Sequence, residues 1–184
     1  CLCAMPMCNA YVQCLCAMPM CNAYVPCLCA MPICNAYVQS LCARPSRQAN
    51  YRGVGAEGRG DDKNVKGGQE MAVAADAVVL SSPEYHGTMS GVMKNSLDWL
   101  YSKHTSGKIF GLVSTLGGQS SSNTLNHMRI AARWIHGWVT PEQIAIPNIK
   151  EAFNDDGSLV NNDINGRVKV LASSIVENTI KLRR

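Results

Sequence analysis

The chain has 184 residues, which is enough for one ordinary domain and too few for two. With 47% hydrophobic and 16% charged residues it can bury a sizeable core, and its net charge of +4 at pH 7 is mild. Because no block of Lys or Arg stands out, the composition argues against nucleic acid or a membrane surface as a partner. No uninterrupted apolar run favours a transmembrane helix, and no signal peptide is recognisable.

The N-terminal part differs in composition from the rest. All ten cysteines lie between Cys1 and Cys42, and no Asp, Glu, Lys or Arg occurs before Arg44. Near-copies of the unit CLCAMPMCNAYVQ fill residues 1–39. The cysteine-free remainder suits a reducing compartment, so we expect a cytoplasmic protein. The absence of an initiator methionine leads us to expect a fragment.

Two interpretations of the repeats compete. Closely spaced thiols can bind zinc or copper(I), which keeps a cysteine-rich metal-binding protein open as an alternative. However, the unit is shorter than the roughly 20–50 residues of most stackable repeats, and its proline interrupts helices and strands. We therefore expect residues 1–43 to be a disordered repetitive segment rather than a folded domain, without a metal site.

Residues 44–70 are rich in glycine and lack apolar periodicity, which predicts a linker. Gly53–Gly58 matches the G-x-G-x-x-G pattern of dinucleotide sites. That fingerprint requires a strand before it and a helix after it, and the sequence indicates neither. We reject it as a nucleotide site.

A regular pattern begins at Met71 and indicates three strands that alternate with three helices. Buried strands are predicted from the apolar, β-branched runs and helices from apolar residues at helical spacing. The predicted strands lie within 72–82, 108–115 and 143–147, and the predicted helices at about 90–102, 121–136 and 162–182.

This alternation predicts an α/β fold, a parallel sheet with helices on its faces. The loops that follow parallel strands meet at the carboxyl edge of the sheet, where ligands bind. Residues 82–88 and 114–121 should therefore lie at one edge. Both loops are short and polar, and their glycines would let a flat heteroaromatic ligand approach the backbone.

The segment SPEYHGTMSGVMKNSLDWL at 82–100 resembles the T-P-E-Y-N-G-S-x-P-G-x-L-K-N-A-x-D-W signature of the NADPH-dependent FMN reductases, a flavodoxin-like family. The later segments STLGGQSSS and QIAIPNIKEAFNDDGSLVN follow the order and spacing of that family. The resemblance covers about residues 70–182. It implies a flavodoxin-like sheet and an NAD(P)H-dependent oxidoreductase that transfers hydride from nicotinamide to FMN and on to a small acceptor.

FMN and NADPH are the cofactors that this resemblance implies, with the flavin ring bound by the backbone of both loops. His86 stands where the family has asparagine, and Ser90 where it has proline. Hydride transfer between cofactors needs no protein acid or base, so we predict no catalytic residue. The predicted cofactor-binding residues are Ser82, Pro83, Glu84, Tyr85, His86, Gly87, Ser114, Gly117 and Gly118.

Members of this family begin with a strand and a G-S-x-R-x-x-S phosphate loop, where this chain has repeats and a linker. We therefore expect residues 71–184 to be a partial domain without the first strand and the phosphate loop. An inactive truncated or frame-shifted reductase fragment is the main alternative function. The resemblance also implies a homodimer or homotetramer formed through the helix around Val92–Tyr101, with Met93, Trp99 and Tyr101 as buried anchors.

Overall fold

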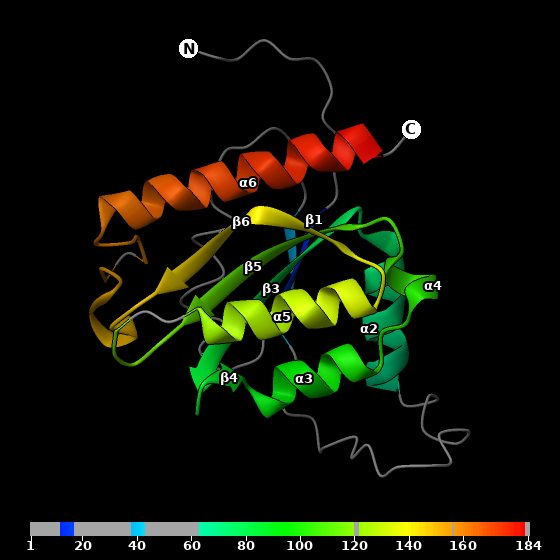
Figure 1. Ribbon diagram of the computed structural model, residues 1–184, viewed down its shortest axis with the longest axis horizontal. Helices are drawn as coiled ribbons and strands as arrows, with labels where there is room; N and C mark the ends of the chain where they lie inside the picture. Colours follow the sequence, from blue (N-terminus) through cyan, green and yellow to red (C-terminus); the bar gives the residue numbers. More distant parts are fainter. Residues whose placement is uncertain (1–11, 17–37, 43–62, 120–121, 156, 183–184) are drawn as a thin grey trace.

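The computed structural model describes residues 12–16, 38–42, 63–119, 122–155 and 157–182 (Figure 1). Its strands are β1 (Val12–Cys16), β2 (Val38–Cys42), β3 (Ala77–Tyr85), β4 (Thr88–Met89), β5 (Ile109–Thr115) and β6 (Trp138–Ile146). Its helices are α2 (Lys63–Ala74), α3 (Gly91–Asp98), α4 (Ser102–Thr105), α5 (Asn123–Trp134), the 3₁₀ turn η2 (Ile149–Glu151) and α6 (Asn162–Leu182). The Gly53–Gly58 motif lies outside the described residues.

The centre of the sheet is formed by β3 and β5, which pair in parallel from Ala77 opposite Ile109 to Pro83 opposite Thr115. The first six residues of β5 are all buried, as expected of a strand covered on both faces. On the other side of β5, β6 pairs in parallel and ends the sheet. The predicted parallel α/β sheet is thus confirmed.

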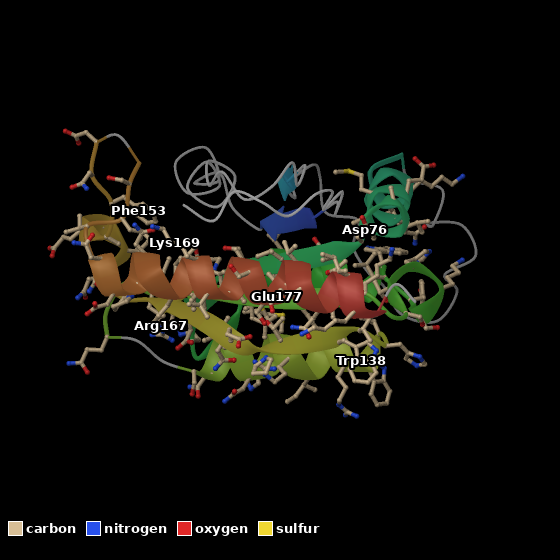
Figure 2. All side chains as sticks on the ribbon, turned by 90° about the horizontal axis from the view of Figure 1, so that it is seen from above. Asp76, Trp138, Phe153, Arg167, Lys169 and Glu177 are labelled. Carbon is tan, nitrogen blue, oxygen red and sulfur yellow. The ribbon has the colours of Figure 1, made fainter. Side chains whose placement is uncertain are left out.

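Helices cover both faces of this sheet. Figure 1 shows α6 on one side and α3 and α5 on the other. Alternate residues of the strands accordingly enter two separate cores: Leu80 and Leu112 pack in the core with α3 and α5, whereas Val79 and Val113 pack in the core with α6. The outer side of α6 carries charged residues, including exposed Arg167, Lys169 and Glu177 (Figure 2).

The repeats supply two strands that the sequence did not predict. The structure pairs β1 in parallel with both β2 and β3, which gives the strand order β2-β1-β3-β5-β6. This is the 2-1-3-4-5 order of flavodoxin-like sheets. The difference has a physical reason: VQCLC and VQSLC are equivalent parts of the repeat, contain no proline, and pair in register with each other. The expectation that the sheet lacks its first strand therefore differs from the structure.

Two boundaries also differ from the prediction. Residues 63–74 form α2, although the sequence predicts a linker up to residue 70 and a strand from residue 72. A short apolar run such as AVAA fits a helix or a strand equally well, which explains the error. The predicted helix over 90–102 is two helices, because Tyr101 is extended and its N–H donates to Nδ1 of His104, 3.0 Å away. The division into domains remains a prediction.

Some apolar residues of the helices lie at the surface instead of in the two cores. Val92 on α3 and Leu182 at the end of α6 are exposed. Trp99 is buried, whereas Trp134 and Trp138 are 77% and 62% exposed and lie outside both cores. Trp138 lies at the rim of the molecule (Figure 2). None of the described helices has the length and apolar character needed to cross a bilayer.

Candidate functional site

The two loops predicted to form the site follow adjacent strands. Ser82 on β3 lies opposite Ser114 on β5, and Pro83 lies opposite Thr115. Because β3 and β5 are parallel, the loops that follow them leave the sheet at the same edge. The sequence-based placement of the two loops side by side is therefore confirmed.

The first loop is a tight β-hairpin. Strand β3 continues to Tyr85, which pairs with Thr88 on β4. His86 and Gly87 form the turn with φ of 50° and 79°. Two positive φ angles are typical of a type I′ turn, for which Asn-Gly is the preferred sequence. Histidine is among the few non-glycine residues that tolerate this region, so His86 can replace the asparagine of the family signature.

Hydroxyl groups hold the base of the hairpin. Oγ of Ser82 accepts a hydrogen bond from the N–H of Ser90 at 3.0 Å and donates to the carbonyl of Pro83 at 2.9 Å. Oγ of Ser90 accepts from the N–H of Met93 at 3.2 Å and caps α3. A proline at the position of Ser90 has no N–H to donate. The substitution of serine for the family proline therefore adds a bond to the hairpin.

Two further bonds connect the hairpin to α5. Oε2 of Glu84 accepts from the N–H of Thr124 at 3.2 Å. Nδ1 of His127 lies 2.8 Å from Oγ1 of Thr88. A Cβ added to Gly87 would lie 3.7 Å from Nδ2 of Asn123. This role of α5 is not among the predictions from the sequence, although the polar residues at the start of a helix just after the second loop were a usable signal.

The second loop is fixed through its backbone. The N–H of Leu116 donates to the carbonyl of Ile146, and that of Ile149 to the carbonyl of Leu116. The N–H of Asn148 donates to the carbonyl of Gly118 at 2.9 Å. Gly117 and Gly118 are exposed, and none of the described residues has an atom within 4 Å of a Cβ built on either. A flat ligand can therefore approach the backbone of this loop.

Two buried hydroxyls near this edge have no hydrogen-bond partner in the part of the chain that the structure describes: Oγ of Ser114 and Oγ1 of Thr124, both on residues with no exposed surface. Ser114 follows Leu112 by two positions, so it faces the side of the sheet that α5 covers. Buried polar atoms without a partner are uncommon, and a bound ligand is one of the explanations for them.

The site combines backbone amides, hydroxyls and glycines at the edge of a parallel sheet. Pro83 and Glu84 are half-buried, whereas Tyr85 and His86 are exposed at the tip of the hairpin. Among the described residues, no three His, Cys, Asp or Glu side chains are grouped to hold a metal ion. Such an arrangement can bind a planar ligand that carries several hydrogen-bonding atoms.

Comparisons with known proteins agree with this description. The family model for NADPH-dependent FMN reductase matches residues 38–151. An FMN-dependent NADPH-azoreductase from Staphylococcus aureus (strain USA300) is 42% identical over 101 residues, which are 55% of this chain and 54% of that protein. The chain thus spans about half the length of the curated relatives that it matches.

Solved structures show the same fold at low sequence identity. FerB, a flavoenzyme NAD(P)H:(acceptor) oxidoreductase from Paracoccus denitrificans, superposes with a TM-score of 0.70 at 17% identity, over 92% of this chain and 99% of that chain. A flavodoxin from the domain Archaea gives a TM-score of 0.56 at 14% identity, over 94% and 99% of the two chains. The predicted flavodoxin-like fold is confirmed.

Proposed function

Because the chain belongs to the NADPH-dependent FMN reductase family, we propose that it is an NAD(P)H-dependent oxidoreductase that binds FMN at the carboxyl edge of its sheet. Hydride would pass from the nicotinamide to FMN and on to a small acceptor. The relatives from Staphylococcus aureus are named for FMN and NADPH dependence, which supports these two cofactors for this chain.

One observation carries the proposal: the pairing of Ser82 with Ser114 aligns the hairpin that bears the family signature with the glycine loop. The residues at this edge fit the ring of a flavin. Gly117 and Gly118 leave their backbone open to a planar group. The Oγ of Ser114 is a buried donor without a partner among the described residues, and a ring heteroatom can satisfy it.

Bound FMN supplies the chemistry of hydride acceptance. The residues of this chain bind and orient the ring: the backbone of the hairpin from Pro83 to Gly87 on one side, and the backbone at Gly117 and Gly118 on the other. Oγ of Ser114 would donate a hydrogen bond to the ring. Positioning of this kind lowers the barrier because the reacting groups meet already aligned.

We also propose a cytoplasmic protein that forms a homodimer or homotetramer through the segment Val92–Tyr101, which contains most of α3 and the residue before α4. Val92 and Tyr101 are 37% and 47% exposed and are available for contact. Met93 and Trp99, predicted from the sequence as anchors, are buried within their own chain and cannot fill that role. Sedimentation of the wild type and of a Tyr101→Lys variant tests the interface, and the variant should shift toward the monomer.

Titration of the purified full-length chain with FMN tests the function. We expect flavin fluorescence to be quenched on binding and NADPH consumption to require added FMN. If the chain neither binds FMN nor consumes NADPH with it, the proposal is wrong and the inactive-fragment alternative is correct. If the same protein retains zinc, the cysteine-rich metal-binding alternative is supported, and if it retains none, that alternative is rejected.

A further inference from the structure

The β3–β4 hairpin cannot hold its position by strand pairing alone. The pairing of β3 with β5 ends at Pro83, and beyond it strand pairing joins the hairpin only through Glu84–Met89 and Tyr85–Thr88 among the described residues, too few pairs to fix its position. Its turn also places His86 at a φ of 50°, which a non-glycine residue rarely adopts. The position of the hairpin therefore depends on side-chain bonds to the rest of the molecule.

The strongest candidate for such a bond comes from Glu84. Its carboxylate accepts from the N–H of Thr124, the second residue of α5. The first N–H groups of a helix have no acceptor within the helix, and the positive end of the helix dipole favours a carboxylate there. Ser122 holds the N-cap position, but its side chain makes no capping bond. Glu84, 40 residues before Thr124, thus serves as the cap of α5.

The start of α5 is also the end of the second loop. Thr124 has no exposed surface, so this turn of the helix is fixed in the core. One turn later, His127 contacts Thr88 on the returning strand of the hairpin. Residues three apart share one side of a helix, so the two bonds attach the hairpin to α5 as a pair.

We propose that Glu84 is a positioning residue, which caps α5 with its carboxylate and thereby fixes the hairpin relative to the glycine loop. The sequence analysis places Glu84 among the residues that bind the cofactor. The geometry assigns its side chain to the protein, while its backbone remains available at the site. The effect on flavin binding rests on the proposed function, whereas the capping of α5 does not.

Four variants test this role. Glu84→Ala removes the acceptor, Glu84→Asp keeps the charge but shortens its reach, and Glu84→Gln keeps an oxygen at the same reach. Glu142→Ala is the matched control, because Oε2 of half-buried Glu142 accepts from Oγ of Ser174 at 2.6 Å on the opposite side of the sheet.

Amide hydrogen exchange without added flavin is measured first. We expect the Thr124 amide and the hairpin amides to exchange about fivefold faster in Glu84→Ala and Glu84→Asp, with smaller changes in Glu84→Gln and none at these amides in Glu142→Ala. The dissociation constant of FMN should rise about fivefold to tenfold in Glu84→Ala and Glu84→Asp. The conservative Glu84→Gln should restore most of the affinity.

Wild-type exchange and wild-type FMN affinity in Glu84→Asp would overturn the proposal. Glu84→Asp decides the question even when Glu84→Ala does not fold, because it alters the side chain by one methylene. If the wild type itself binds no FMN, the proposed function fails, and the exchange of the Thr124 amide still decides whether Glu84 caps α5.

Discussion

The two ends of the central strands use glycine for opposite purposes. Near the amino end, a Cβ added to Gly137 would lie within 2.3 Å of the Phe110 ring, and one added to Gly111 would lie 2.4 Å from Cδ1 of Ile175. At the carboxyl edge, a Cβ on Gly117 or Gly118 would meet no atom of the described part of the chain within 4 Å. One pair of glycines permits close packing, and the other leaves backbone exposed.

The contrast assigns the two ends of the sheet different roles: packing near the amino end serves stability, and open backbone at the carboxyl edge serves ligand binding. Substitutions near the amino end should lower the free energy of unfolding, because interiors are packed without spare volume. At the carboxyl edge, substitutions of Gly118 or of the Ser114 hydroxyl should leave folding nearly unchanged and weaken FMN binding. Each prediction below tests one side of this division.

The largest effect is expected for Phe110→Ala. Phe110 is fully buried on β5, and removing its ring should lower the free energy of unfolding by about 3–5 kcal/mol through lost burial and the remaining cavity. Urea unfolding followed by circular dichroism measures the loss. Phe153→Ala is the control, because Phe153 is only half-buried. Equal losses in the two variants would show that the amino end is not packed as described.

Gly137→Ala should cost about 1–3 kcal/mol, because the new methyl group must displace a ring that has no free space. Gly118→Ala at the open edge should change the free energy of unfolding by less than about 0.5 kcal/mol. In a Phe110→Ala background the cost of Gly137→Ala should fall, since the clash with the ring is gone and the 3.1 Å approach to the Ala132 carbonyl remains. Additive costs in the double variant would contradict this mechanism.

Ser114→Ala should separate folding stability from FMN binding most clearly. Without flavin, the variant should be as stable as the wild type or more stable, because it removes a buried hydroxyl that has no partner within the described chain. The dissociation constant of FMN should rise about twofold to tenfold, the value of one hydrogen bond. Thermal unfolding and fluorescence titration measure the two effects.

Ser82→Ala provides the comparison for that experiment. Ser82 is equally buried, but its hydroxyl both donates and accepts within the chain. Its loss should lower the free energy of unfolding by about 1–2 kcal/mol. If Ser114→Ala destabilises the protein as much as Ser82→Ala does, the hydroxyl of Ser114 is already satisfied and the argument for a ligand contact fails.

The sequence predicts those parts of the fold that periodicity determines. The bounds of α6 agree with the predicted 162–182, and β5 with 108–115 to within one residue. The common edge of the two loops was predictable as well, because it follows from parallel strands and right-handed crossovers. These features depend on local pattern and on topology.

Features that depend on one side chain meeting a distant backbone atom could not be predicted. The bond between Glu84 and Thr124 requires the type I′ hairpin, the packing of α5 and a loop of given length all at once. The support of the second loop by residues 146–149 likewise depends on where β6 ends. The helix α2 was missed because its apolar residues fit either kind of element.

The smallest effect is a dependence of stability on pH near the amino end. Burial, and then the charge of Lys103, lower the pKa of His104 from its ordinary value of 6.5. Its Nδ1 accepts from the N–H of Tyr101, which only the unprotonated nitrogen can do. The unfolded chain therefore binds the proton more tightly, and the free energy of unfolding should fall as the pH drops below about 6.5, until the folded protein is protonated as well.

His104→Asn keeps an acceptor that does not titrate, so its stability should change less over this range, whereas a control His136→Asn at an exposed turn should retain the wild-type dependence. Thermal midpoints measured from pH about 7.5 to 5 compare the three proteins, and parallel curves for the wild type and His104→Asn would exclude His104 as the cause.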